Sequence, residues 1–269
     1  MSSDTAPESA DTDDLRATTR LIPSEASAQA LRLSVVLPLH NEVDRLAAAV
    51  DHLFGLFRGL DWELVLIDLG SDDGTHEYLE RLAGYPNLKV LSEEDPLPLG
   101  HGHRLGALVA RGEAILLAEV DRPLSPRRYR DDLVLLRDQA PLLLYTPQHP
   151  DGSGTAFPSR FLARRVRRML RAPLGHVPLD PVASVPLLRR DQALAILPWY
   201  RGSSRMPACE LIQLALLGPE PAFVELPANA EDWPSVGWLE LPGLLCEARG
   251  LVRRVQESGA GSSNDGARR

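Results

Sequence analysis

The chain has 269 residues, of which 44% are apolar and 25% are charged, and its formal net charge is -8. This length and apolar content suffice for one large domain with its own hydrophobic core. The acidic balance excludes a general nucleic-acid-binding protein, because such proteins carry a basic surface, and no nucleic-acid partner is expected.

Both ends of the sequence have the composition of disordered tails. Residues 1–28 and 258–269 are polar and lack hydrophobic periodicity, which predicts disorder. No apolar stretch approaches the roughly 20 residues that cross a bilayer, and residues 1–14 have neither the basic start nor the apolar core of a signal peptide. The two cysteines are too few for a disulfide framework. We therefore expect a cytoplasmic protein with a single domain over residues 29–257.

The first half of this domain alternates strand and helix patterns. Short, uninterrupted apolar runs are typical of strands buried on both faces, whereas apolar residues spaced by three and four predict amphipathic helices. Strands are predicted at 33–38, 63–68, 88–91 and 114–118, and helices at 41–57, 76–83 and 106–111. This alternation implies an α/β fold with a doubly wound, mostly parallel central sheet flanked by helices. Ligands bind such sheets beyond the carboxyl ends of the strands, so the site is predicted there.

The second half of the domain is rich in proline and its pattern is weaker. Helices are predicted at 159–171, 191–197, 207–217 and 243–256, with one strand at 223–226. The helix at 159–171 has the clearest apolar and basic stripes of this group.

The first motif is VVLPLHNE at residues 35–42, which joins a predicted strand to a predicted helix. His40 can present a flat ring and a hydrogen-bonding edge to a nucleotide base. The alternative is an ordinary strand followed by a helix, with Asn41 as the capping residue.

The second motif is DLGSDDGT at residues 68–75, directly after a predicted strand. The carboxylate of Asp68 can accept hydrogen bonds from a base or ribose, and the glycines let the backbone turn tightly beside a nucleotide. The alternative is a surface turn rich in aspartate and glycine.

The third motif is ARGEAILLAEVD at residues 110–121, in which Glu119 and Asp121 follow a buried strand. Two carboxylates two residues apart can both reach one divalent cation. The alternative is that Glu119 ends the strand and pairs with Arg122 or Arg127.

In this order, the three motifs resemble those of family 2 glycosyltransferases, which read VVIPTYNE, DDGSxDGT and DxD, with a pattern closest to dolichyl-phosphate mannose synthases. The resemblance implies the glycosyltransferase-A fold, with residues 29–125 as the nucleotide-sugar-binding half and residues 126–257 as the acceptor half. The chain differs from the family pattern at four positions, where it carries His40, Leu69, Glu119 and Pro123.

The resemblance also implies a role for each matching residue. The donor, a UDP- or GDP-sugar, is expected to contact residues of the three motifs and of a glycine-rich segment between them. These donor-binding residues are Pro38, His40, Glu42, Asp68, Gly70, Ser71, Arg104 and Glu119. Glu119 and Asp121 are expected to hold Mg²⁺ or Mn²⁺, which would bridge the donor diphosphate and neutralise the leaving group. The resemblance implies inversion at the anomeric carbon.

The glycine-rich segment is GHGHRLG at residues 100–106. Its glycine pattern is similar to a dinucleotide-binding loop, but no convincing strand precedes it and Pro96 and Pro98 do. In the glycosyltransferase resemblance it matches the stretch before the metal motif, where Arg104 would contact a phosphate.

On the acceptor side, the resemblance implies catalytic or acceptor-binding roles for Asp180 and Glu210, together with Asp121, and Asp232 is added where an acidic segment replaces the basic residues of the family. Asp232 or its neighbour Glu231 could serve as general base, although both are equally consistent with a loop. The predicted helix at 159–171 carries a basic stripe that could hold a lipid-phosphate acceptor or lie on an acidic membrane surface at its inner face. The alternative is a solvated basic face on an acidic protein. The stripe comprises Arg160, Arg164, Arg167, Arg168 and Arg171.

The expected function is a metal-assisted, inverting sugar transfer in the synthesis of a cell-envelope polysaccharide or glycolipid. The rival is a catalytically impaired relative that acts as a binding or scaffold module, since Leu69, Glu119 and an acidic segment at 229–235 replace family residues. A nucleotidyltransferase is disfavoured, because residues 38–44 lack the Gly/Arg/Lys-rich loop of that class. A Rossmann-type dehydrogenase is weaker still.

Overall fold

The computed structural model describes residues 20–22, 33–138, 140, 142–148, 164–169, 171, 184–196 and 223–229, and residues 246, 249, 250 and 253 near the end of the chain. The strands within these residues are β1 (Arg20–Ile22), β2 (Leu33–Leu39), β3 (Trp62–Leu69), β4 (Leu88–Glu93), β5 (Ala114–Leu117), β6 (Leu142–Gln148), β7 (Val185–Arg189) and β8 (Phe223–Asn229). The helices are α2 (Val43–Leu56), α3 (Thr75–Leu82), α4 (Leu99–Val109), α5 (Tyr129–Asp138) and α7 (Arg190–Ile196).

These strands form one eight-stranded sheet in the order β1-β4-β3-β2-β5-β7-β6-β8. The pairs β2–β3, β3–β4, β2–β5 and β6–β8 are parallel. Only β1 and β7 run against their neighbours among the described strands. The predicted doubly wound, mostly parallel sheet is therefore confirmed, and β2, β3, β4 and β5 end at one common edge.

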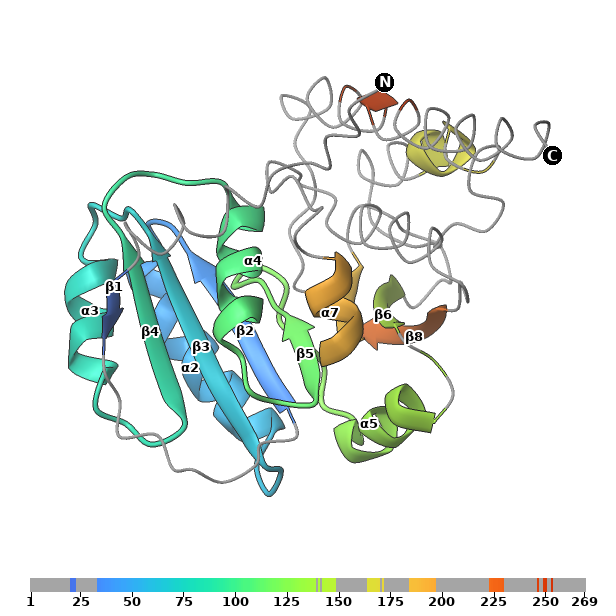
Figure 1. Ribbon diagram of the computed structural model, residues 1–269, viewed down its shortest axis with the longest axis horizontal. Coiled ribbons are helices and arrows are strands. Elements are labelled where there is room, and N and C mark those ends of the chain that lie inside the picture. Colours follow the sequence, from blue (N-terminus) through green and yellow to red (C-terminus); the bar gives the residue numbers. More distant parts are fainter. Residues whose placement is uncertain are drawn as a thin grey trace, which may run out of the picture.

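Helices cover both faces of this sheet. Alternate residues of β2 face opposite sides, so Val35 packs in one core cluster with α2, α3 and α5, and Val36 packs in a second with α4 and α7. In Figure 1, α4 and α7 lie in front of the sheet and α2 lies behind it. Burial on both faces explains why the strand sequences are continuous apolar runs.

Helix α4 begins seven residues earlier than the sequence pattern indicated, because its glycines serve packing. A Cβ atom on Gly102 would lie 2.5 Å from Cβ of Pro38, and one on Gly106 would overlap the side chain of Val36. The two glycines therefore form a bare face through which the helix backbone approaches β2 and β3. The glycine-rich segment at 100–106 is thus helical and contains no nucleotide-binding loop.

Several elements differ from the sequence prediction. Residues 20–22, which the composition placed in a disordered tail, form β1 and pair with β4. The pattern also missed α5, β6 and β7, and both missed strands contain a proline, at Pro147 and Pro186. The helix predicted at 207–217 and the rest of both tails lie outside the described residues. No helix within the described residues is long and apolar enough to cross a membrane.

Candidate functional site

The loops after β2 and β3 are tied together at the carboxyl edge of the sheet. The backbone N–H of Asn41 donates to Oγ of Ser71 at 3.0 Å, and the N–H of Asp72 donates to Oδ1 of Asn41 at 2.9 Å. Asn41 has a φ of 57°, a left-handed conformation that asparagine tolerates better than most residues. Asn41 therefore bridges two loops, and the capping role considered from sequence belongs to other groups.

The start of α2 is capped by the second motif. The N–H of Glu42 donates to Oγ1 of Thr75 at 2.9 Å, and the N–H of Val43 donates to Oδ2 of Asp73 at 3.1 Å. Thr75 in turn donates to Oδ1 of Asp73 from its N–H at 2.9 Å and from its hydroxyl at 2.6 Å. Helix N–H groups that lack a partner within their own helix are thus satisfied from another loop. The first and second motifs form one rigid unit.

Asp68 fixes the loop after β3 through hydrogen bonds of its buried side chain. Its side chain is only 2% exposed, and its Oδ1 accepts the N–H of Ser71 at 3.1 Å. Its Oδ2 lies 3.0 Å from Nδ1 of His76 and 3.2 Å from Oγ of Ser92. A nucleoside would reach these oxygens only by displacing their partners. Asp68 thus positions the backbone of Ser71, and its contact with a nucleoside stays a prediction.

Three further donor-binding predictions fall on this loop and on β2. His40 is exposed, and its Nδ1 lies 3.1 Å from the carbonyl oxygen of Leu69, which holds the ring at the edge of the sheet. Gly70 has a φ of 70°, and a Cβ there would lie 2.5 Å from the backbone of Asp95. Pro38 is buried and packs closely beneath Gly102, and its donor contact stays a prediction.

Three carboxylates gather where β2 and β5 end. Burial raises the pKa of Glu119, and the charge of Asp121 and a hydrogen bond with it act in the same direction, whereas Arg122 lowers it. Burial also raises the pKa of Glu42; Arg45 opposes this effect, and the charge of Asp121 adds to it. The charge of Asp121 therefore acts on both glutamates. Like charges disfavour the ionised form of a neighbouring carboxyl, so the three acids together lack balancing positive charge.

Arginines hold both glutamates of this cluster. Nη1 of Arg122 is 3.1 Å from Oε1 of Glu119, so the pairing considered as an alternative from sequence does form. Nη2 of Arg45 is 2.7 Å from Oε2 of Glu42. Each arginine follows its glutamate by three residues, which places both pairs on single turns of the backbone.

The donor chemistry of Glu119 and Asp121 fits a hard divalent cation. Carboxylate oxygens are the ligands that Mg²⁺ and Mn²⁺ prefer, and Mg²⁺ commonly takes only one or two carboxylates beside water and substrate phosphates. Within the described part of the chain, no group of three or more His, Cys, Asp or Glu side chains could hold a metal ion. A cation here would therefore rely on this pair together with oxygens from water and ligand.

Sequence reasoning gave little weight to His103, which supports the third motif. It is buried on α4, and its Nε2 lies 3.0 Å from the carbonyl oxygen of Ala118, the residue before Glu119. Burial lowers the pKa of His103 to about 4, so the ring is neutral near pH 7 and donates its Nε2–H to that carbonyl. The sequence signal that could have identified this role was a histidine at a position of the helix that faces the sheet.

The loop that follows the third motif is also fixed by buried polar groups. Arg127 pairs with Asp132 at 2.7 Å, and the hydroxyl of Tyr145 donates to Asp132 at 3.1 Å. Nε2 of His52 lies 2.7 Å from the carbonyl oxygen of Leu124. Residues 118–128 are therefore held by α2, α4, α5 and β6.

The remaining predicted residues divide between described and undescribed parts. Arg104 lies half-buried on α4, within electrostatic reach of His101. In the basic segment, Arg164, Arg167, Arg168 and Arg171 are exposed, with Val166 buried between them. The other predicted residues lie outside the described part of the chain, namely Asp180, Glu210, Asp232 and Arg160.

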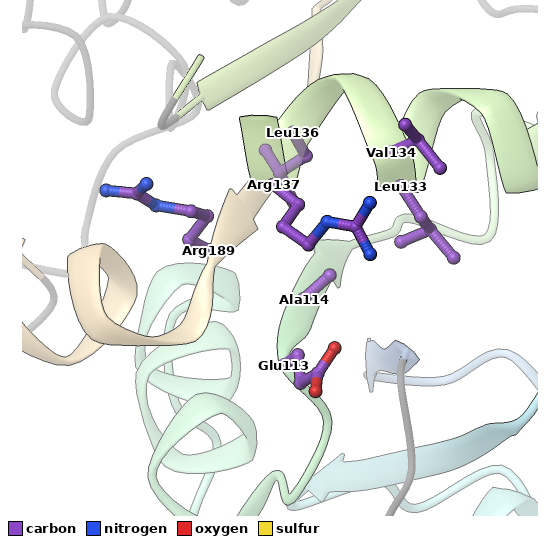
Figure 2. Close-up of a pocket in the computed structure, with 7 residues that line it drawn as sticks. All are labelled: Glu113, Ala114, Leu133, Val134, Leu136, Arg137 and Arg189. Atoms are coloured by element: carbon purple, nitrogen blue, oxygen red, sulfur yellow. The ribbon is translucent and has the colours of Figure 1, made fainter. Parts of the chain in front are cut away.

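A pocket of about 230 Å³ lies at the opposite end of β5. It is lined by Glu113, Ala114, Leu133, Val134, Leu136, Arg137 and Arg189. Figure 2 shows Arg137 extending toward Ala114 and Glu113, whereas Arg189 points away from them. Arg137 pairs with Asp138 and Arg189 with Asp191, so both positive charges are already balanced. The acidic cluster at the other end of β5 carries the unbalanced charge.

Comparison with known proteins finds a family whose sequence model these motifs match. The sequence model of the family described as "Glycosyl transferase family 2" matches residues 34–153, which include all three motifs. A dolichyl-phosphate beta-glucosyltransferase of Trichomonas vaginalis is 31% identical over 97 residues, which are 33% of this chain and 30% of that protein. The chain therefore spans about a third of the length of that curated relative.

Solved structures share the fold at low sequence identity. Glucosyl-3-phosphoglycerate synthase from Mycobacterium tuberculosis, in complex with Mn²⁺, UDP-glucose and phosphoglyceric acid, superposes with a TM-score of 0.61 and 19% identity, over 84% of this chain and 79% of that one. TarS from S. aureus in complex with UDP has a TM-score of 0.54 and 16% identity, over 84% of this chain and 65% of that one. These likenesses establish the architecture of the sheet and its helices.

Proposed function

We propose that residues 34–153, which match the sequence model of glycosyl transferase family 2, form a glycosyltransferase domain, and that the protein transfers a sugar from a nucleoside-diphosphate sugar to an acceptor. One observation carries this proposal. The acidic pair Glu119–Asp121 stands at the carboxyl end of β5, beside two loops that hydrogen bonds lock into one unit. A ligand that carries a nucleoside next to a diphosphate, with a divalent cation, suits that combination.

On the donor side, His40 and the loop at 70–72 receive the nucleoside. The exposed ring of His40 offers a flat surface and its second nitrogen, and the carboxylate of Asp68 keeps the backbone of Ser71 in place. Arg104 on α4 is the residue proposed to contact a phosphate of the diphosphate. Similar proteins have been solved in complex with UDP or UDP-glucose, so uridine nucleotides are the first to test, with guanosine nucleotides for comparison.

Glu119 and Asp121 would hold Mg²⁺ or Mn²⁺, and a bound cation would neutralise the charge that develops on the leaving diphosphate. In the proposed reaction the acceptor oxygen forms a bond to the anomeric carbon while the bond to the diphosphate breaks on the opposite face. The configuration of the sugar therefore inverts. His103, through the carbonyl of Ala118, keeps the backbone before the acidic pair fixed.

The acceptor proposal rests on the relatives and on the basic segment. Curated relatives are dolichyl-phosphate glucosyltransferases, whose name specifies a lipid phosphate. Exposed arginines at 164, 167, 168 and 171 would attract such an acceptor or the acidic face of a membrane, where the protein would lie peripherally on the cytoplasmic side. Asp180, Glu210 and Asp232 stay the predicted acceptor-side residues.

The test measures donor binding and sugar transfer in parallel. Thermal stabilisation by UDP, GDP and their sugars, each with and without Mn²⁺, should show a metal-dependent shift with one base, because a ligand of the folded state raises the melting temperature. Asp121→Ala should lose the metal-dependent part of that shift and the transfer of labelled sugar to a polyprenyl phosphate. Asp51→Asn, an exposed acid on α2, is the matched control and should behave as wild type. Full transfer by Asp121→Ala would refute the proposed role of the pair, and no shift with any nucleotide would favour a scaffold function.

A further inference from the structure

Arg122 contacts the carboxylate of Glu119, so a cation that binds Glu119 would compete with Arg122 for that carboxylate. The backbone N–H of Arg122 donates to the carbonyl oxygen of Glu119 at 3.2 Å, which closes the turn after the third motif. The same turn brings Nη1 of Arg122 to 3.1 Å from Oε1 of Glu119. Both side chains are largely buried, with exposed fractions of 13% and 8%. The guanidinium therefore occupies one of the oxygens that a metal ion would use.

The charges around this pair explain why the guanidinium is held there. Arg122 is the cationic partner of the largely buried carboxylate of Glu119, and Asp121 adds a second carboxylate two residues along the chain. A positive charge is thus needed at this position whenever no cation is bound. Removing a partner from a buried ion pair leaves a costly uncompensated charge. Arg122 should consequently leave Glu119 only when each group gains another partner.

A divalent cation together with a diphosphate supplies both replacement partners. The cation can take the carboxylate of Glu119, and the planar guanidinium can form paired hydrogen bonds to phosphate oxygens. A cation alone provides a partner for Glu119 but leaves Arg122 without one. A diphosphate alone provides a partner for Arg122 but leaves Glu119 without one. Each ligand therefore removes the cost that opposes the other, which is a positive coupling between two ligands.

We propose, building on the donor site described above, that Arg122 is an internal competitor for the cation: it holds Glu119 in the ligand-free protein and passes to the donor diphosphate when the cation binds. The exchange makes binding of the cation depend on the nucleotide. It also assigns Arg122 to the donor diphosphate, a contact that sequence comparison did not indicate. Figure 1 places this turn directly after β5, at the carboxyl edge of the sheet.

The experiment titrates Mn²⁺ into nucleotide-free protein and follows free Mn²⁺ by electron paramagnetic resonance, so that no catalytic turnover is needed. Arg122→Gln should bind Mn²⁺ about tenfold more tightly than wild type, because a unit positive charge a few ångströms from the site is gone. The same variant should bind UDP in saturating Mn²⁺ several-fold more weakly, since the diphosphate loses a guanidinium. Arg122→Lys keeps the charge and should retain the weak Mn²⁺ binding of wild type.

Arg137→Gln is the matched control, because it removes the same charge from an exposed pair with Asp138 on α5 and should change neither affinity. Circular dichroism melting confirms that each variant is folded before titration. Unchanged or weaker Mn²⁺ binding by folded Arg122→Gln would overturn the proposal, and so would a complete lack of Mn²⁺ binding by all variants. If Arg122→Gln binds Mn²⁺ more tightly but neither it nor the wild type binds UDP, the competition between Arg122 and the cation at Glu119 is supported. The proposed donor role of the site is then refuted.

Discussion

A carboxylate is buried beside a positive charge at each end of the parallel strands. The charges are balanced at the amino end, whereas negative charge is in excess at the carboxyl end. At the amino end, Oε2 of Glu63 lies 2.6 Å from Nζ of Lys89. Its Oε1 accepts the hydroxyl of Ser34 at 2.7 Å and the N–H of Arg111 at 2.6 Å. Nζ of Lys89 also donates to the carbonyl oxygen of Val109 at 2.9 Å. This network is closed, because its charges are equal in number and both carboxylate oxygens have partners.

At the carboxyl end, Glu119 shares its surroundings with Asp121 and is held by Arg122. Glu42 adds a third acid, and burial raises the pKa of both glutamates. The cluster is open, because negative charge exceeds what its nearest arginines satisfy. The difference teaches that buried charge by itself does not mark a functional site. An excess of buried charge of one sign is the better indicator of a functional site, since a ligand of the opposite charge can balance it.

The largest effect should come from breaking the closed network. Glu63→Gln leaves the ammonium of Lys89 buried without its counter-charge, which should lower the free energy of unfolding by about 3–5 kcal/mol. Urea denaturation measures this loss. The double variant Glu63→Gln, Lys89→Met should recover much of it, whereas nucleotide-induced stabilisation of the folded fraction should persist. A loss as small as that of an exposed ion pair would show that the Glu63–Lys89 network does not contribute as a buried ion pair.

The second effect concerns pH and the support of the open end. The folded-state pKa of His103 is about 4, against 6.5 for the unfolded chain, so between these values the unfolded state binds more protons. The stability from the neutral, buried ring is complete above pH 6.5 and is lost as the pH falls toward 4, by about 3 kcal/mol in all. Urea denaturation at several pH values between 7 and 4.5 measures this dependence. The free energy of unfolding of His103→Gln, which keeps a donor near Ala118, should fall less steeply with decreasing pH than that of the wild type. Equal slopes would contradict this assignment.

A third, smaller effect tests the helix that connects the two ends. Gly106→Ala should cost about 1–3 kcal/mol, because the added methyl overlaps Val36 and lies 2.8 Å from Cδ1 of Ile67. Gly55→Ala in α2 is the matched control, since nothing lies within 4 Å of its added Cβ. It should gain up to about 1 kcal/mol from helix propensity. If both substitutions stabilise, α4 does not pack on the sheet through a bare glycine face.

The smallest effect on stability should accompany the largest effect on function. Asp121→Asn removes a like charge from the open cluster, so the free energy of unfolding should change by no more than about 0.5 kcal/mol. Its metal-dependent stabilisation by nucleotide should nevertheless disappear. Glu63→Gln and Asp121→Asn, measured side by side, would then separate the closed end from the open one. A destabilisation by Asp121→Asn as large as that of Glu63→Gln would remove the distinction.

The loops of the site were predictable from sequence, whereas the contacts between them were not. Three motifs following apolar runs placed 40–42, 70–75 and 119–121 at one edge of the sheet. The side chains that join the loops interact with residues about 30 positions away, as Asn41 does with Ser71. Nothing in the local pattern specifies such pairs. The hydrogen bonds of Asp68 to Ser71, His76 and Ser92 were likewise not predictable from sequence.

Two elements differ from the sequence prediction for a related reason. The predicted helix began only at residue 106, because propensity opposes glycine in helices, but close packing on β2 and β3 overrides that preference and α4 begins at Leu99. The pattern also missed β7, because Pro186 in an interior strand contradicts the usual position of proline. The acceptor-side residues Asp180, Glu210 and Asp232 stay predictions, since they lie outside the described part of the chain.

Lys89, the only lysine in the sequence, is confined to the closed network and is 7% exposed. Reagents and enzymes that modify lysine amines thus find no accessible lysine on the folded protein. Labelling of Lys89 by an amine-reactive dye would report opening of the sheet itself, because the amine becomes reactive only when the strands that enclose it separate. The same burial means that covalent coupling through lysine cannot attach the native protein to a surface. The chain thus carries its own single-residue sensor of global unfolding.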